Sequence, residues 1–191
     1  MDNRKELQAR WPKQNEFFYL QVLDLFPRRI RENILKIPAV KTELKKDRWL
    51  YIQGDNGTGK TMWASFVLLD SITSAYELNR RVFINVPELL MKFRGTFESK
   101  QSLEEVLSYY AKIPLLILDD LGVEKTTDWV NEIFYLLINR RYEAMLPTVI
   151  TSNFTLHDLQ EKFGDRRIVD RIKEMSEVVH LDGDNFRENR L

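Results

Sequence analysis

The sequence has no cysteine, few histidines, no long apolar run and no excess of charge of either sign. Because none of the 191 residues is cysteine, a disulfide framework and a thiolate zinc site are both excluded. The two histidines, His157 and His180, are isolated and form no metal-binding pattern. No apolar run reaches the roughly 18 residues that a membrane-spanning helix requires, and no signal-type stretch follows the N-terminus. These absences favour a soluble, cytoplasmic protein with no membrane partner.

The charge balance limits the kind of nucleic-acid contact that the chain can make. Its 29 basic and 29 acidic residues cancel, which argues against a globally basic nucleic-acid binder. Any such contact must therefore be local. The length suits one domain with a short extension, and a hydrophobic content of 43% is enough for a sizeable core.

Segments typical of strands and of helices alternate from residue 48 onward. Short apolar runs predict strands at 48–53, 81–85, 114–119, 147–151 and 177–181. Helices are expected over 60–78, from Pro87, and over 102–112, 128–144, 155–162 and 165–174. Glu105 follows Ser102 by three residues, as in a capping box. This alternation indicates an α/β fold, with a parallel sheet wrapped by helices.

Residues 1–47 differ in character from the core that we expect over 48–191. They carry aromatic residues and a basic cluster, and Pro12, Pro27 and Pro38 divide them. We interpret them as an N-terminal helical extension and linker, with a helix between the first two prolines. The apolar side of that helix either packs on its own domain or docks on a partner.

Residues 54–61 fit the phosphate-binding pattern G-x-x-x-x-G-K-[ST], between a predicted strand and a predicted helix. Glycines in such a loop let successive backbone N–H groups point at phosphate oxygens, and the following helix adds its N-terminal dipole. Lys60 would reach the β- and γ-phosphates of ATP, and the Thr61 hydroxyl would coordinate Mg²⁺. The residues expected to contact the nucleotide here are Gly54, Asp55, Asn56, Gly57, Thr58, Gly59, Lys60, Thr61 and Met62. The alternative is a chance glycine-rich turn, which the strand-loop-helix context disfavours.

Two carboxylates, Asp119 and Asp120, stand at the end of the apolar run at 114–119. That run does not alternate, as is typical of a strand covered on both faces. Ligands of open α/β sheets bind at the carboxyl ends of strands. Asp119 would hold Mg²⁺, and Asp120 would orient or deprotonate the attacking water. The alternative is that both aspartates cap the loop after the strand.

The P-loop, the run LDDLGVEK at 118–125, Trp129 and the run PTVITSN at 147–153 occur in one order and spacing. In this they resemble the DnaC/DnaI-type replicative helicase loaders and the related IstB transposition ATPases, within the AAA+ superfamily. The resemblance runs from about Arg48 to Arg190. It implies a P-loop NTPase fold, a three-layer parallel sheet with a RecA-like core, without a C-terminal helical lid.

The resemblance also implies three further site residues. Asn153 matches a polar sensor that distinguishes ATP from ADP, although it could instead cap the turn before Thr155. Arg171 is the best match to the arginine finger, which reaches the γ-phosphate of a neighbouring subunit. The alternative is that Arg171 belongs to a solvated, arginine-rich face. Arg187 matches the second sensor of the same subunit, unless it is only a residue of the tail.

The segment at 90–100 interleaves aromatic residues with cations, a composition that suits single-stranded nucleic acid. In related loaders this region faces single-stranded DNA. The candidate DNA-binding residues are Lys92, Phe93, Arg94, Phe97 and Lys100. Because Phe93 and Phe97 are spaced i and i+4, the alternative is that both are core residues of one helix face.

The leading hypothesis is an ATPase, weak alone and stimulated by assembly or DNA, that loads a hexameric replicative helicase onto single-stranded DNA. The resemblance implies that ATP drives self-association into a ring or spiral. A transposition helper that binds DNA and a transposase is the main alternative. A small-molecule kinase and a non-enzymatic adaptor switched by ATP are further alternatives.

Overall fold

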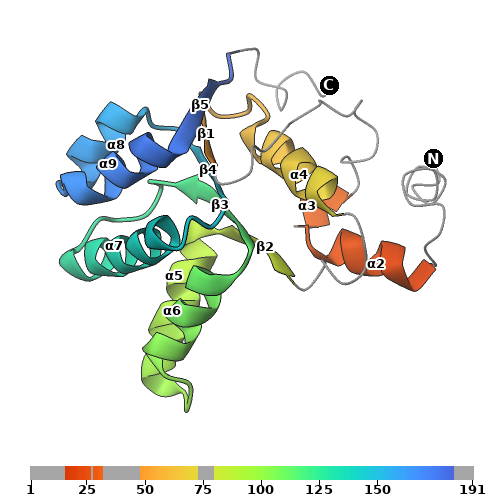
Figure 1. Ribbon diagram of the computed structural model, residues 1–191, viewed down its shortest axis with the longest axis horizontal. Coiled ribbons are helices and arrows are strands. Elements are labelled where there is room, and N and C mark those ends of the chain that lie inside the picture. Colours follow the sequence, from red (N-terminus) through yellow and green to blue (C-terminus); the bar gives the residue numbers. More distant parts are fainter. Residues whose placement is uncertain (1–15, 27, 32–47, 73–79, 183–191) are drawn as a thin grey trace.

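Five parallel strands form the sheet at the centre of the computed structural model, which describes residues 16–26, 28–31, 48–72 and 80–182. They are β1 (Trp49–Gln53), β2 (Arg81–Asn85), β3 (Leu115–Leu121), β4 (Thr148–Ser152) and β5 (Ser176–His180). Their order across the sheet is β2-β3-β4-β1-β5 (Figure 1). Because the strands are parallel, their carboxyl ends meet at one edge. The chain segments after β1 and at the end of β3 therefore flank the end of β4.

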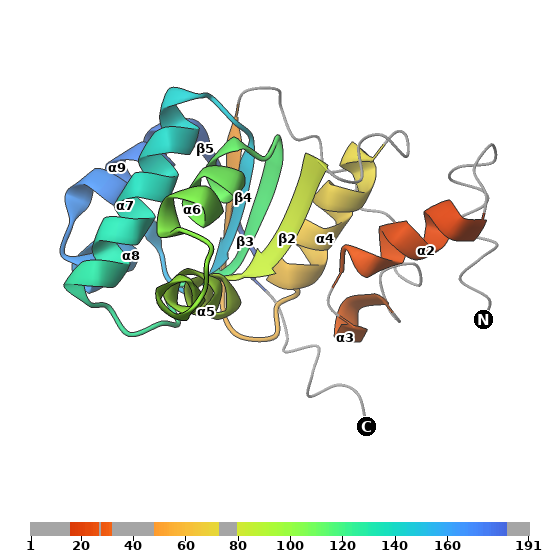
Figure 2. The same cartoon turned by 90° about the horizontal axis from the view of Figure 1, so that it is seen from below.

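Helices cover both faces of this sheet, as Figure 2 shows. One face carries α5 (Val86–Gly95), the 3₁₀ turn η2 (Thr96–Glu98), α6 (Leu103–Lys112), α7 (Asp128–Glu143), α8 (Leu156–Phe163) and α9 (Arg166–Met175). The other face carries α2 (Glu16–Asp24), α3 (Arg28–Arg31) and α4 (Lys60–Ser71). Each face has its own apolar cluster, so the fold is the expected three-layer α/β arrangement. None of the described helices is long and apolar enough to cross a bilayer.

The helix boundaries follow from local side-chain contacts. The expected capping box is confirmed, because the Ser102 hydroxyl accepts from the Glu105 N–H while the Glu105 carboxylate accepts from the Ser102 N–H. A second capping box joins Thr155 to Asp158 at the start of α8. That helix ends at Gly164, whose φ of 66° suits glycine.

The prediction of a helix over 60–78 is wrong at its C-terminal end. Helix α4 ends at Ser71, and Ile72 is already extended. The Ser71 hydroxyl donates to the Leu68 carbonyl at 2.6 Å, and Arg81 of β2 donates to the same hydroxyl at 2.6 Å and also to the Ser71 carbonyl. Arg81, ten residues later in the chain, thus satisfies hydrogen-bond acceptors at the C-terminus of α4. Apolar periodicity cannot reveal such a contact. Residues 73–79 lie outside the described part of the chain.

The N-terminal helices pack on the core, as one of the two interpretations expected. Val22, Phe26 and Ile30 are buried in the same apolar cluster as residues of α4 and β1. Arg31 of α3 links back to the end of α2. Its guanidinium donates to the Phe26 carbonyl and forms an ion pair with Asp24 at 2.7 Å. The proposed domain boundary at residue 47 borders the range 32–47, which is outside the described residues, and stays a prediction. The expectation that no helical lid follows β5 falls on residues 183–191, which are also outside them.

Candidate nucleotide site

The loop after β1 needs glycine at defined positions. Gly54, Gly57 and Gly59 have positive φ values of 151°, 89° and 93°. A Cβ atom on Gly54 would lie 2.3 Å from the carbonyl oxygen of Leu181, which follows β5. The Leu181 N–H also donates to the Gln53 carbonyl at 2.8 Å, so the chain after β5 rests directly against the loop. The loop then opens into α4 at Lys60, which directs the helix N-terminus at the space where phosphates would lie.

Lys60 is only 5% exposed and is held within this loop. Its ammonium group donates to the carbonyl oxygens of Gly54 and Asp55, both at 2.7 Å. Phosphate oxygens are charged and form stronger hydrogen bonds with an ammonium than carbonyls do. An arriving phosphate can therefore replace these carbonyls. Met62 lies in the first turn of the same helix and packs against the apolar cluster behind the loop.

A β-bulge in β3 presents the two carboxylates. Leu118 pairs with Ile150 and Leu121 pairs with Ser152, so Asp119 and Asp120 together face the single residue Thr151. Asp120 has a φ of 62°, which is unusual for a residue with a side chain. Bulges re-aim side chains, and this one brings two successive carboxylates to the carboxyl end of the sheet.

Thr151 stabilises the bulge, and the sequence analysis gave it no such role. Its hydroxyl donates to Asp119 Oδ1 at 2.7 Å and accepts from the Asp120 N–H at 2.9 Å. Thr151 is fully buried, and its single hydroxyl satisfies both the buried Asp119 carboxylate and the part-buried Asp120 N–H. Its importance depends on the register of β3 against β4, which the sequence does not reveal.

Thr61 and Asp119 fit a magnesium ion. The Thr61 hydroxyl donates to Asp119 Oδ2 at 3.3 Å, so the two oxygens already lie side by side. Adjacent ligands of an octahedral Mg²⁺ are ~2.9 Å apart, given bonds of about 2.05 Å at right angles. Mg²⁺ in nucleotide sites takes one or two protein oxygens, with phosphates and waters completing the shell. A hydroxyl and one buried carboxylate beside a phosphate loop match that pattern.

Asn85, which sequence reasoning missed, is a partner of the second carboxylate. It ends β2, and its amide donates to Asp120 Oδ2 at 3.2 Å. The same residue is the N-cap of α5. The available signal was a polar residue at the end of the strand that lies beside β3, although strand order had to be known before it could be used.

Asn153 lies beside the P-loop, as the resemblance implied. Its amide donates to Asn56 Oδ1 at 3.0 Å, and its own Oδ1 is buried without a hydrogen-bond partner. Because the Asn153 Oδ1 accepts no backbone N–H, the alternative that Asn153 caps the turn before Thr155 is wrong. An unsatisfied buried oxygen is costly in a folded protein, which is consistent with a ligand-binding position. Its function as a sensor stays a prediction.

The loop that carries Asn153 is fixed on both sides. The Ser152 hydroxyl donates to the Leu121 carbonyl at 2.7 Å, and the Tyr51 hydroxyl donates to the Phe154 carbonyl at 2.7 Å. Burial raises the pKa of Tyr51, so this hydroxyl keeps its proton and remains a donor. Strands β1 and β3 thus hold the position of Asn153 relative to the P-loop and the carboxylates.

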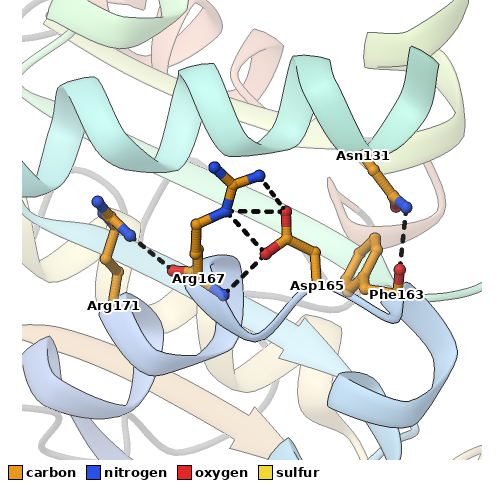
Figure 3. A network of polar contacts seen from close by, with 5 residues as sticks. All are labelled: Asn131, Phe163, Asp165, Arg167 and Arg171. Carbon is orange, nitrogen blue, oxygen red and sulfur yellow. Dashed lines mark hydrogen bonds and ion pairs between the residues drawn. The ribbon is translucent and has the colours of Figure 1, made fainter. Parts of the chain in front are cut away.

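Arg171 is not part of this cluster. It lies on α9, where it donates to the Arg167 carbonyl of its own helix (Figure 3), and its other contacts are with residues of α7. A function at the nucleotide of a second subunit therefore stays a prediction. Arg187 lies outside the described residues.

The structure divides the candidate DNA-binding residues. Phe93 is fully buried and packs edge-on against Tyr110 at 6.0 Å, so the prediction that its ring stacks on a base is wrong. Phe97, four residues later, is 70% exposed because α5 has ended and η2 turns its ring outward. Its ring centre lies 6.2 Å from that of Trp129, and the Arg94 guanidinium lies 5.4 Å from the centre of the same indole. Arg94, Phe97 and Trp129 are called the aromatic surface below.

Two lysines lie near the aromatic surface in the sequence. Lys92 pairs with Glu88 at 3.3 Å, and both side chains are exposed, so this pair contributes little to stability. Lys100 is exposed in the turn after η2. Trp129 comes from the first turn of α7, and its place beside residues of α5 and η2 could not be predicted from the sequence.

Comparison with known families supports the assignment of the fold and of the loop. A family described as IstB-like ATP binding protein matches residues 26–190. The replicative helicase loader DnaI of Bacillus subtilis (strain 168) is 30% identical over 157 residues, which are 76% of this chain and 49% of that protein. The insertion sequence IS232 putative ATP-binding protein of Bacillus thuringiensis subsp. berliner is 30% identical over 149 residues, 75% of this chain and 57% of that protein. The chain thus spans about half the length of these relatives.

Solved structures give the same fold. The crystal structure of DnaI has a TM-score of 0.57 at 25% identity and covers 93% of this chain and 87% of its own. AMPPCP-bound DnaA from Aquifex aeolicus has a TM-score of 0.61 at 19% identity, covering 86% and 51%, and this likeness concerns the fold alone. With the P-loop, the paired carboxylates and the match over 26–190, the chain belongs to the IstB-like ATP-binding family and has the AAA+ P-loop fold.

Proposed function

We propose that this protein binds and hydrolyses ATP with Mg²⁺ and helps to place a hexameric replicative helicase on single-stranded DNA. The observation that carries the proposal is the convergence of Thr61, Asp119, Asp120 and Asn153 around one phosphate loop. The relative named as a replicative helicase loader supplies the biological context. The ATPase is weak in the isolated subunit and is stimulated by assembly or DNA.

Each residue of the site has a chemical task in this proposal. Lys60 exchanges its two carbonyl partners for phosphate oxygens. Asp120 accepts the proton of the attacking water, once its contact with the Asn85 amide is released. Asn153 donates to the water or to the γ-phosphate. Mg²⁺, held by Thr61 and Asp119, supplies neutralisation of phosphate charge.

The proposal for hydrolysis is tested by separating binding from chemistry. Calorimetry with ATP and Mg²⁺ should detect binding by the native protein and by Asp120→Asn, and none by Lys60→Ala. Hydrolysis should fall in Asp120→Asn by about 100-fold or more, since a general base contributes about 10²–10⁴-fold. If calorimetry detects no heat of binding between the native protein and millimolar ATP, the proposal is wrong. An Asp120→Asn variant at full rate would remove only the assigned base.

The aromatic surface is the proposed contact with single-stranded DNA. Phe97 offers an exposed ring for base stacking, and Arg94 adds a cation beside the Trp129 indole. Lys92 and Lys100 add charge for the backbone phosphates. Because only a few cations take part, the affinity should be modest and should fall as salt concentration rises.

Anisotropy with a labelled single strand tests this surface. Phe97→Ala should weaken binding by about 5-fold or more, since stacking on one base contributes about 1–3 kcal/mol. Tyr109→Ala is the matched control, because Tyr109 is also an exposed aromatic residue but lies on α6, where its ring contacts Tyr110. Equal loss in both variants would argue against a defined stacking site.

A transposition helper is the second candidate function. The relative from insertion sequence IS232 matches as well as DnaI does, at 30% identity. Affinity capture from the source cell in the presence of ATP distinguishes the two. Recovery of a hexameric helicase supports the loader, whereas recovery of a transposase, together with preference for double-stranded DNA, supports the helper.

A further inference from the structure

Arg171 is held by neutral partners. Its guanidinium carbon lies 5.2 Å from the ring centre of Tyr135 and 5.5 Å from that of Tyr142, both on α7. Its Nε–H donates to Asn139 Oδ1 at 2.7 Å, and Nη1 donates to the Arg167 carbonyl at 2.9 Å. Two aromatic rings, one amide and one carbonyl thus surround the cation.

Two other arginines of α7 and α9 are paired with carboxylates. Arg140 forms two hydrogen bonds with Glu104, at 2.7 and 2.8 Å, and Arg167 pairs with Asp165 at 2.8 Å (Figure 3). Within the described residues, Arg171 has no carboxylate at ion-pair distance. The Asp165 carboxylate, which is paired with Arg167, attracts Arg171 only from beyond ion-pair distance, so Arg171 keeps an attraction for a phosphate group.

Asn139 has a fixed orientation. Its Nδ2 donates to Glu143 Oε1 at 2.8 Å, one helix turn further along α7. An amide group has a donor end and an acceptor end, so a donor end fixed by Glu143 turns the acceptor end toward Arg171. Tyr142 is fixed as well, since its hydroxyl donates to Glu174 at 2.9 Å.

We propose that Tyr135, Asn139 and Tyr142 form a cradle on α7 that positions Arg171 for the triphosphate bound to a second copy of this chain. Their i, i+4 and i+7 spacing places them on one helix face. Asn139 is the central positioning residue, because it fixes Nε, while Nη2 forms no hydrogen bond with the described residues. The inference rests on the proposed ATPase function and on the arginine-finger assignment of Arg171 that the family resemblance implies, and it adds the residues that hold this arginine in place.

Preorganisation is the physical reason for such a cradle. A free arginine side chain samples many rotamers, and it must lose that freedom when it meets a phosphate. The cradle removes most of this freedom before assembly, with partners that do not compete electrostatically with the phosphate. Small errors in the placement of a reacting group reduce rates strongly, so loss of Asn139 should lower hydrolysis without affecting nucleotide binding.

A mixing experiment tests the cradle. Lys60→Ala subunits cannot bind ATP but carry Arg171, whereas Arg171→Ala subunits bind ATP but lack the arginine. Mixing the two should restore hydrolysis that neither has alone. When the first subunit also carries Asn139→Ala, the restored rate should fall by about 10-fold, while ATP binding by the second subunit is unchanged.

Placing Asn139→Ala in one subunit or in the other distinguishes a positioning role of Asn139 from structural damage to α7. Asn139→Ala placed in the Arg171→Ala subunit should have no effect, because that subunit has no arginine to position. Asn131→Ala in the Lys60→Ala subunit is the matched control, since Asn131 lies on the same helix but donates to the Phe163 carbonyl at 2.9 Å (Figure 3). It should leave the restored rate unchanged.

Each contrary result has a distinct meaning. Full restoration with Asn139→Ala in the Lys60→Ala subunit overturns the cradle alone. Equal losses from Asn139→Ala in either subunit, or from Asn131→Ala, mean that α7 acts only structurally, and this also overturns the cradle. If the Lys60→Ala and Arg171→Ala mixture fails with Asn139 intact, the action of Arg171 across the interface is wrong and the cradle falls with it, whereas the proposed ATP binding and hydrolysis stand on their own tests.

Discussion

Two buried cations, Arg141 and Lys60, differ in which parts of the chain supply their hydrogen-bond acceptors. Arg141 is fully buried, and its guanidinium donates to the Thr148 hydroxyl and to the carbonyls of Tyr110, Ala111, Ile113 and Pro147. These partners come from the end of α6 and the start of β4. The two carbonyl partners of Lys60 belong instead to the loop just before its own helix.

This difference indicates that the charge of Arg141 is structural and that of Lys60 is functional. Burial lowers the pKa of Arg141 to about 9, and its several acceptors compensate for the lost hydration. Its partners come from distant parts of the chain, so they cannot leave without disrupting the fold. The loop carbonyls that hold Lys60 can be replaced by phosphate oxygens without moving any strand. Substitutions at the two sites should therefore differ in kind.

Arg141→Met should produce the largest loss of stability. It leaves several buried acceptors unsatisfied, each at a cost of about 1–3 kcal/mol, so we expect the free energy of unfolding to fall by about 4 kcal/mol. Urea denaturation followed by circular dichroism measures it. Arg140→Met is the matched control, because Arg140 is the next residue and its ion pair with Glu104 is exposed, and it should cost less than about 1 kcal/mol. Similar losses in the two variants would contradict the structural assignment of Arg141.

Thr151→Val should cost about 2 kcal/mol, because it removes the hydroxyl that serves both Asp119 and the Asp120 N–H. The same variant should weaken the effect of Mg²⁺ on ATP affinity, measured by calorimetry with and without the metal. Thr151→Ser keeps the hydroxyl and should recover most of both losses. A valine variant with unchanged Mg²⁺ dependence would mean that the bulge does not position Asp119.

A smaller effect, whose size depends on pH, is expected at Glu124. Burial raises the pKa of its carboxyl above the ordinary 4.5, although the Gly122 N–H donates to Oε2 at 3.1 Å. The folded state thus holds the proton more tightly than the unfolded state, and the stability from this group is lost as pH rises from about 4.5. Glu124→Gln should therefore match the native protein at pH 4 and exceed its stability at pH 8. Equal free energies of unfolding for Glu124→Gln and the native protein at both pH values would contradict this prediction.

The smallest change in stability is expected for Lys60→Met, which should alter the free energy of unfolding by less than about 1 kcal/mol. Its aliphatic part remains in the same space, and one of the two carbonyls that it releases belongs to the exposed residue Asp55. ATP binding should nevertheless be lost in calorimetry. Because Arg141→Met introduces the same side chain, the pair compares the two sites directly. A large destabilisation by Lys60→Met would remove the contrast between them.

The sequence predicted those parts of the site that follow from local pattern and strand direction. The pattern of the P-loop is contiguous, and parallel strands that end together bring Thr61 to Asp119. All five strands were predicted within two residues at either end. What could not be predicted depends on register or on distant contacts. Asn85 required the order of the strands, and Thr151 required the bulge in β3.

Helical spacing alone also could not separate Phe93 from Phe97. The i, i+4 rule places both on one face, but α5 ends at Gly95 between them and η2 turns the second ring away. Asn139 was missed for a related reason. The sequence cannot tell that α7 lies against α9, and only that packing gives its amide a partner.

The contact between Gly54 and Leu181 has a practical consequence for detecting the nucleotide. Position 182 is exposed and follows the residue that touches the phosphate loop. Because the chain has no cysteine of its own, an Asp182→Cys variant would accept a single environment-sensitive dye at that position. Its fluorescence would report whether the loop is occupied, with no label on the nucleotide itself.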